Sequence, residues 1–406
     1  MDAEGLSRYA DAIVRDALRL GDGDVLAVHG EPAHRELLVA LADAGYRAGC
    51  RYCDVVTTDL RVKRARALHA PLESLGEQPA WHDKRMVDLL AADAGVVTVN
   101  GPGEPGLLGD VPPDRAARET TRILAGAPRY LRAVTRGDAR FCVIAWPTPA
   151  WAAQVYPELS QDDAVEALGR DLLTFARLAP DDPPDGWARH VARLEAAARE
   201  LTARGVRELR LRGPGTDLTL GLPEGARWIG GTLQGKRVRY SPNVPTEEVF
   251  TSPTPGATEG TFACSRPLDM EGRSIDGIRG EFRRGRLVRI EADRPDDASF
   301  LEASFARDRN AGRLGEVALV DGQSRVGAAG RGYATTLLDE NAASHIALGC
   351  GFSFTRDPGA ARENRSGVHV DVMIGRPELE VRGRDAKGQT FDVLVDGVLL
   401  PSSTSS

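Results

Sequence analysis

The chain lacks an excess of positive charge and has no long apolar stretch. Its 406 residues carry 52 Lys and Arg against 59 Asp and Glu, which gives a net charge of −7. This balance argues against nucleic acid as the main partner. No apolar run approaches the length of a membrane span, and the acidic start Met1-Asp2-Ala3-Glu4 lacks the features of a signal peptide. We therefore expect a cytoplasmic protein with neither nucleic-acid nor membrane partners.

Cysteine and histidine are also scarce. Five cysteines, an odd number spread over a long chain, do not form a disulfide framework. Cys50 and Cys53 form a C-x-x-C motif without a second pair at zinc-site spacing, and we interpret them as ordinary half-buried thiols. Of only seven histidines, the last two, His345 and His369, have carboxylates nearby in the sequence. Their settings are therefore informative.

The order of the predicted elements indicates two domains, as expected for a chain too long for one hydrophobic core. In the first half, strand-like runs at 24–29, 52–57, 95–99 and 141–146 alternate with helix-like segments. This alternation predicts a parallel sheet with flanking helices. After a helix predicted at 187–204, the apolar period changes to two, which is typical of short antiparallel strands. We expect an α/β N-terminal domain over 1–195 and a β-rich α+β catalytic domain over 196–406.

Acidic and imidazole side chains in the second half occur beside glycine or other small residues. They are Glu248, Glu316, Glu340, His345, His369 and Asp371. His369 and Asp371 are two apart on a predicted strand, so their side chains project from one face. For the same reason Glu248 and its neighbour Glu247 point to opposite faces, and at most one of them is expected to bind a metal.

Each of these residues also has an ordinary interpretation. Glu248 fits a solvated charge at a strand start, whereas Glu316 precedes an apolar run and needs a cation or backbone N–H donors if it is buried. Glu340 and His345 flank small residues that suit a helix start, and a single histidine there is more often structural. Taken together, carboxylates with imidazoles are what a pair of hydrolytic divalent ions requires. The set therefore indicates a metallohydrolase.

The segments around these residues resemble a known family. Asn243 to Phe250, Leu314 to Val320, Asp339 to Gly349 and His369-Val370-Asp371 closely resemble the aminopeptidase T / aminopeptidase S / PepS family of dinuclear metallopeptidases. The resemblance extends over nearly the whole chain and includes Gly213 to Leu218. It implies an α/β N-terminal domain, a β-rich catalytic domain, a homodimer, and release of N-terminal residues from short peptides or aminoacyl amides.

The resemblance also implies roles for the individual residues. Two divalent ions per chain, Zn, Co or Mg, would be held by Glu248, Glu316, His345, His369 and Asp371, with Glu340 as an additional ligand. The ions would lower the pKa of a shared water. Glu316 or Glu340 would take the proton of that water as the catalytic base.

One position departs from the family pattern. The family has a tyrosine seven residues after the histidine of the third segment, where this chain has Phe352. Loss of one hydroxyl donor at an active site typically costs about 10² to 10³ in rate. The departure leaves open a specialised amide hydrolase with a non-peptide substrate and a catalytically impaired scaffold protein. A third alternative is a non-haem iron dioxygenase, because His345, His369 and Asp371 have the composition of a facial triad. Ring-cleaving dioxygenases of hydroxypyridines are distantly similar to this family.

Overall fold

Two sets of contacts divide the chain into two units. The computed structural model describes residues 2–77, 79–112, 115–116, 118–119, 128–270 and 273–400. The first unit comprises Met1–Arg189, Thr232–Thr246 and Glu271–Arg273, and the second comprises His190–Gly231, Glu247–Met270 and Ser274–Ser406. Residues 232–246 therefore belong to the first unit, although they follow the expected boundary at 195 and 196. Within the described ranges, no helix has the length and apolar character needed to cross a membrane.

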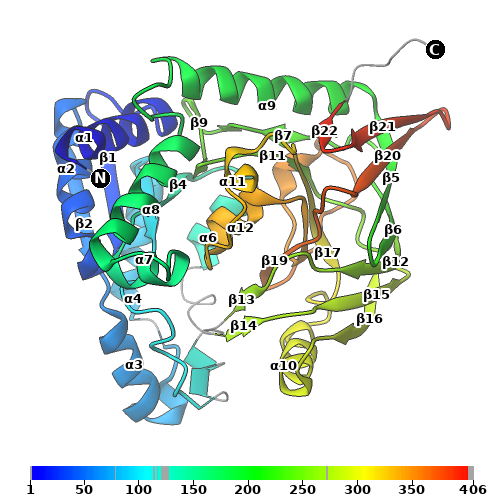
Figure 1. The fold of residues 1–406 in the computed structure, drawn as a ribbon, viewed down its shortest axis with the longest axis horizontal. Helices are drawn as coiled ribbons and strands as arrows, with labels where there is room; N and C mark the ends of the chain where they lie inside the picture. Colours follow the sequence, from blue (N-terminus) through cyan, green and yellow to red (C-terminus); the bar gives the residue numbers. More distant parts are fainter. Residues whose placement is uncertain are drawn as a thin grey trace. The chain divides into compact units, whose positions relative to one another are not determined.

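The first unit contains the predicted parallel sheet (Figure 1). Its strands lie in the order β10-β4-β3-β1-β2. Their bounds are β1 Val25–Gly30, β2 Tyr52–Thr57, β3 Gly95–Asn100, β4 Arg140–Ala145 and β10 Asn243–Val244. Leu26, Val28 and Val97 are fully buried, so apolar β-branched and leucine side chains form the interior, as in parallel sheets covered by helices. The α/β prediction for this part of the chain is confirmed.

Helices accompany this sheet. They are α1 Ala3–Asp11, α2 Arg35–Arg47, α3 Leu60–His69, α4 Ala80–Ala91, α6 Pro128–Arg136, α7 Pro149–Val155 and α8 Gln161–Phe175. Shorter helical segments are η1 Ala12–Ala17, η2 Pro32–His34 and η3 Leu72–Ser74. In α2, Leu37, Leu41 and Ala44 recur at helical spacing and are fully buried, so packing against the sheet holds this helix in place.

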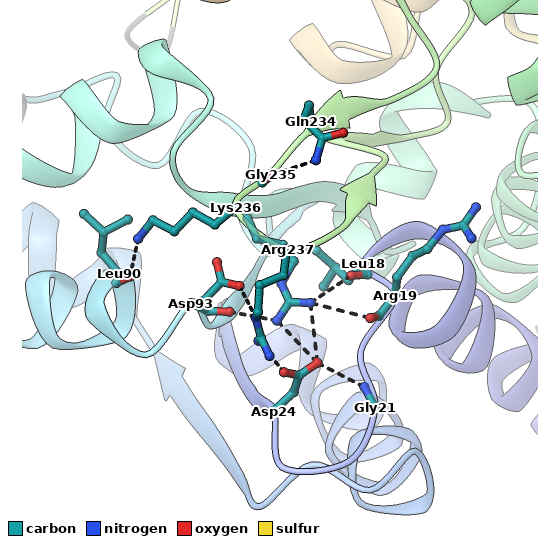
Figure 2. Close-up of polar contacts among 11 residues, drawn as sticks. Leu18, Arg19, Gly21, Asp24, Leu90, Asp93, Gln234, Gly235, Lys236 and Arg237 are labelled. Carbon is teal, nitrogen blue, oxygen red and sulfur yellow. Dashed lines mark hydrogen bonds and ion pairs between the residues drawn. The ribbon is translucent and has the colours of Figure 1, made fainter.

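A hairpin from residues 232–246 is fastened to the first unit by charged side chains. Its strands are β8 Leu233–Gln234 and β9 Arg239–Tyr240. Arg237 donates from Nε to Asp93 over 2.7 Å and from Nη2 to Asp24 over 2.5 Å (Figure 2). The guanidinium of Arg237 holds the pKa of Asp24 below its usual value despite the opposing effect of burial. Lys236 donates to the carbonyl of Leu90 over 3.1 Å, so two adjacent cations fix the hairpin.

The second unit is β-rich, as predicted. An eight-stranded sheet has the order β16-β15-β12-β6-β5-β20-β21-β22, and a five-stranded sheet has the order β19-β18-β17-β11-β7 (Figure 1). The larger sheet contains β5 Val206–Gly213, β6 Thr216–Gly221, β12 Thr258–Ala263, β15 Arg279–Arg283, β16 Arg286–Glu291, β20 Glu380–Asp385, β21 Thr390–Val395 and β22 Val398–Leu399. The smaller sheet contains β7 Ile229–Gly230, β11 Glu248–Thr251, β17 Leu314–Val320, β18 His345–Gly349 and β19 His369–Met373.

The remaining elements of the second half are short apart from two helices. The helices are α9 Gly186–Ala203, α10 Pro295–Phe305, α11 Arg325–Ala328, α12 Thr336–Ala342 and the 3₁₀ segment η4 Ser353–Thr355. Strands β13 Leu268–Met270 and β14 Arg273–Ile275 pair with each other.

The two faces of the five-stranded sheet differ in chemistry because alternate residues of a strand point to opposite sides. One face carries Val249, Val317, Leu319, Ile346, Leu348 and Val372, all of which belong to the hydrophobic core of the second unit. The intervening positions of the same strands belong to the other face. That face carries the predicted metal ligands.

Candidate metal centre

Antiparallel register brings the predicted ligands together on one face of the five-stranded sheet. Glu316 on β17 pairs with Ala347 on β18, and Ala347 pairs with Asp371 on β19. Side chains of directly paired residues share a face, so the carboxylates of Glu316 and Asp371 flank the methyl group of Ala347. His345 and His369 lie two positions from members of this row and share its face. The alanine leaves space that a larger side chain would fill.

Five of the six predicted residues form two adjoining groups. Ligand atoms of Glu248, Glu316 and His345 lie within 4.8 Å of one another, and so do those of Glu316, His369 and Asp371. Glu316 belongs to both groups. These are the potential metal-binding groups of His, Cys, Asp and Glu in the described part of the chain.

The distances within the groups suit joint coordination of cations. His369 Nε2 lies 3.2 Å from an oxygen of Glu316 and 3.2 Å from an oxygen of Asp371. His345 Nε2 lies 3.3 Å from Glu248 Oε2 and 4.0 Å from Asp371. Glu248 Oε2 is buried and accepts no hydrogen bond from the described residues, despite the nearby imidazole. A buried carboxylate oxygen without a donor is costly unless a cation satisfies it.

Backbone carbonyls orient both imidazoles. His345 Nδ1 lies 3.2 Å from the carbonyl of Ala343, and His369 Nδ1 lies 2.7 Å from the carbonyl of Cys350. A carbonyl can only accept, so Nδ1 carries the proton and Nε2 is left with its lone pair when the ring is neutral. Nε2 is the atom that faces the carboxylates in both residues. This is the arrangement by which outer contacts prepare histidine for a metal.

Burial and mutual repulsion alter the acidity of the site. Burial, together with the charges of Glu316 and Asp371, raises the pKa of Glu248 to about 8. The pKa of His345 is raised because nearby Glu248 and Asp371 outweigh the opposing effect of burial. The same competition, with Asp371 and Glu316 as partners, raises the pKa of His369 well above its usual value. The close packing of carboxylates and imidazoles therefore favours added positive charge at this cluster.

Glu340 lies next to both groups but in neither of them. It belongs to α12, is half-buried, and interacts electrostatically with Asp371, Glu248 and Glu316. Burial and these carboxylates raise its pKa well above the usual value. Glu340 therefore lies within electrostatic range of the predicted ligands without joining either group.

The expected helix start between Glu340 and His345 is wrong. Helix α12 ends at Ala342, and His345 begins strand β18. The small residues between Glu340 and His345 are compatible with either the start or the end of a helix. His345 lies in a strand because it pairs with Ala318 and Met373.

The two neighbouring glutamates point to opposite sides, as alternation predicts. Both are buried, so the interpretation of solvated charges at a strand start is wrong. Glu248 joins the first ligand group, whereas Glu247 lies 3.6 Å from Nε2 of His190. The backbone N–H of Glu247 donates to Oδ1 of Asn341 over 2.6 Å. Asn341, which sequence reasoning missed, thereby connects α12 to the start of β11.

Aromatic side chains adjoin the second ligand group. The ring of Phe352 lies 5.3 Å from the ring of His369 and 5.7 Å from that of Phe250, measured between centroids. Phe354 stacks on Phe352 at 5.2 Å. Position 352 therefore lies beside His369, one of the predicted ligands. The clustering of the three phenylalanines was not visible in the sequence.

Comparisons with known proteins show which family the chain belongs to. The family model described as "Thermophilic metalloprotease (M29)" matches residues 2–399. Aminopeptidase T of Thermus thermophilus is 34% identical, with 94% of this chain and 96% of that protein covered. Aminopeptidase 2 of Geobacillus stearothermophilus and aminopeptidase PepS of Streptococcus thermophilus are each 31% identical, with 97% of both chains covered.

Solved structures extend the comparison to the fold. Wild-type AmpT from Thermus thermophilus superposes with a TM-score of 0.89 at 32% identity, covering 98% of this chain and 99% of that one. A 2,5-dihydroxypyridine dioxygenase from Pseudomonas putida KT2440 gives a TM-score of 0.53 at 15% identity, with both chains fully covered. The second likeness concerns the fold alone.

Proposed function

Because this chain belongs to the M29 family of thermophilic metalloproteases and is a peptide-bond hydrolase, we propose that it acts as an aminopeptidase with two divalent ions. Glu248, Glu316 and His345 would hold one ion, and Glu316, His369 and Asp371 would hold the other. The observation that carries this proposal is that Glu316 belongs to both ligand groups. The carboxylate of Glu316 would therefore be available to both ions, as a pair of hydrolytic metals requires.

The donor chemistry supports the same proposal. Imidazole nitrogens and carboxylate oxygens suit Zn or Co, and the shared carboxylates are also compatible with Mg. The undonated oxygen of Glu248 gains a partner if an ion is bound. When present, the ions would supply a water of lowered pKa and Lewis acidity toward a carbonyl.

Other groups of this protein would then orient the imidazoles and transfer the proton. The carbonyls of Ala343 and Cys350 keep the two imidazoles oriented. Glu340, which lies within electrostatic range of Glu248, Glu316 and Asp371, would take a proton from the attacking water at its carboxylate and return it to the leaving amine. Glu316 is the weaker candidate for this base, because both divalent ions would compete for its carboxylate oxygens.

We further propose a cytoplasmic homodimer that acts on short peptides or aminoacyl amides. The curated relatives are aminopeptidases over nearly their full length, which supports a free N-terminus as the recognised group. Phe352 beside His369 leaves the alternative of a specialised amide hydrolase or an impaired protein, since the phenylalanine ring carries no hydroxyl to donate.

Metal stoichiometry tests the shared-ligand proposal. Reconstituted wild type should bind two Zn or Co ions per chain and release the N-terminal residue from a panel of aminoacyl amides and dipeptides. His369→Ala should retain about one ion, whereas Glu316→Ala should lose most of both, because its carboxylate serves both groups. Glu224→Gln, whose side chain is 92% exposed, is the matched control and should bind two ions.

Other stoichiometries would select another function. One iron per chain with uptake of O₂ would favour the dioxygenase alternative. Failure to bind metal would favour a scaffold protein. Full retention of both ions by Glu316→Ala would contradict the bridging role.

A further inference from the structure

Three phenylalanine rings of the second unit form an aromatic cluster beside the candidate metal centre. They belong to Phe250 on β11 and to Phe352 and Phe354 in the turn around η4. The rings of Phe352 and Phe354 are stacked, with their centroids 5.2 Å apart. Phe250 meets them edge-on, at 5.7 Å from Phe352 and 6.3 Å from Phe354. Each ring therefore packs against the other two.

Strand register places the aromatic cluster on the same side of the five-stranded sheet as the predicted ligands. Phe250 follows Glu248 by two residues on β11, so both side chains project from one face. Phe250 pairs with Ala318 on β17, and Ala318 pairs with His345 on β18. Directly paired residues share a face. Phe250 thus lies in the row of His345, with the small side chain of Ala318 between them.

The other end of the cluster reaches the second ligand group. The centroid of the Phe352 ring lies 5.3 Å from that of the His369 ring. The backbone N–H of Phe352 donates to Oγ of Ser252 over 2.9 Å, and Oγ1 of Thr355 donates to the carbonyl of Phe352 over 2.7 Å. These bonds hold the turn that carries Phe352 and Phe354. Both rings therefore have a fixed place next to a predicted metal ligand.

The aromatic cluster is separate from the apolar core of the second unit. In the described part of the chain, that core includes Val249, on the opposite face of β11, and neither contains the three rings nor has them packed against it. Phe250 is buried, whereas Phe352 and Phe354 are half-buried. Ligand sites typically combine apolar and aromatic walls with a few polar or metal-binding groups. The cluster and the predicted ligands together have this composition.

We propose that the aromatic cluster is the subsite for the side chain of the substrate's N-terminal residue, and that it selects aromatic and large aliphatic side chains. This inference rests on the aminopeptidase function proposed above. The Cα atom of an N-terminal residue lies between its free amino group and the scissile carbonyl. A side chain that begins there starts at the metal centre and extends onto a neighbouring surface. Phe352 and Phe354 offer an apolar surface of this kind beside His369.

The chemistry of the rings determines the expected preference. Removal of apolar surface from water favours binding, and ring–ring contacts add to it. A polar side chain among the rings would lose hydrogen bonds to water without gaining a partner. A single methylene in an apolar pocket changes discrimination by about 10- to 200-fold. Loss of a whole ring from the cluster should therefore alter selectivity measurably.

Calorimetric titration of the full-length, metal-loaded protein with amino acid hydroxamates tests the subsite without requiring turnover. The hydroxamate group binds divalent ions, and the probes carry the side chains of phenylalanine, leucine and asparagine. Asparagine resembles leucine in size but is polar. Wild type should bind the phenylalanine and leucine hydroxamates at least about tenfold more tightly than the asparagine hydroxamate. Phe354→Ala should reduce that ratio by about threefold or more, whereas Phe354→Leu should retain the preference for leucine over asparagine.

Phe391→Ala is the matched control. It removes another half-buried ring of the same unit, one that packs against the core and lies 4.7 Å from the guanidinium of Arg204. This variant should keep the wild-type ratio of affinities, and urea denaturation should show that it and the Phe354 variants are folded. The ratio of kcat/KM for phenylalanine amide to that for asparagine amide should change in parallel with the ratio of affinities.

The outcomes distinguish the subsite from the proposed function. Equal affinity of wild type for the three hydroxamates would overturn the subsite while leaving the metal centre in place. An unaltered ratio in Phe354→Ala, or an equal loss in Phe391→Ala, would do the same. Failure of all three hydroxamates to bind would contradict the metal centre, and both the proposed function and the subsite would then be wrong.

Discussion

Replacing Glu248 by Gln should stabilise the metal-free protein at mildly alkaline pH while weakening the metal-loaded protein. Glu248 is buried, its Oε2 accepts no hydrogen bond from the described residues, and its pKa is raised to about 8 by burial and neighbouring carboxylates. A carboxyl whose folded pKa is raised contributes stability that is fully present below its unfolded pKa. That contribution declines as pH rises and is lost once pH passes the folded pKa. Glutamine has the same shape and does not ionise.

The size of the effect follows from the shift in pKa. A change from 4.5 to about 8 corresponds to a ceiling of about 5 kcal/mol across that pH window. Entry of water into a metal-free site reduces the penalty, so we expect the variant to exceed wild type by ~1–3 kcal/mol near pH 8. His345 acts in the same direction, because its raised pKa also gives stability that is lost as pH rises. Wild-type stability without metal should therefore fall between about pH 4.5 and about pH 8.

Urea denaturation after removal of metal measures these differences. Wild type, Glu248→Gln and the exposed control Glu224→Gln would be compared across the pH window, then again with saturating Zn. Zn should reverse the order, because wild type keeps a ligand that the variant lacks and ligand binding to the folded state adds stability. A flat pH dependence of metal-free wild type, or a metal-free Glu248→Gln that is less stable than wild type near pH 8, would refute the reasoning.

Three further substitutions test other parts of the site. Glu340→Gln should keep two metal ions and lower kcat by about 10² to 10⁴ with little change in KM; loss of an ion would instead identify Glu340 as a ligand. Ala347→Leu should leave the far-ultraviolet circular dichroism unchanged but abolish metal binding, because the larger side chain occupies the space between Glu316 and Asp371. Normal metal content in that variant would contradict the assigned register. Phe352→Tyr should raise hydrolysis of aminoacyl amides by restoring a hydroxyl donor beside the ions; an unchanged rate at full metal occupancy would show that position 352 does not limit turnover.

Local sequence predicted elements whose periodicity is strong. Strand β2 occupies residues 52–57 as predicted, and α9 begins and ends within one residue of the predicted helix at 187–204. Strict alternation also predicted that Glu247 and Glu248 would point to opposite faces and that His369 and Asp371 would share one. Each of these predictions depends on neighbours within a few residues, whose geometry the backbone imposes directly.

Weak local signals were decided by distant contacts. Strand β10 has only two residues and exists because Asn243 and Val244 pair with β4, about a hundred positions earlier in the sequence. The small residues 341–344 fit either a helix start or a helix end, and pairing of His345 across β18 selected the end.

The sequence by itself determined the two-part architecture, the family, and which side chains are available to bind metal. The tertiary structure decided how those side chains are combined. Glu316 belongs to both ligand groups because the register of three antiparallel strands aligns it with Ala347 and Asp371. Glu340 stands beside the groups because α12 ends before β18 begins. Strand register and burial depend on contacts between residues far apart in the chain. The spacing of residues along the sequence therefore does not predict them.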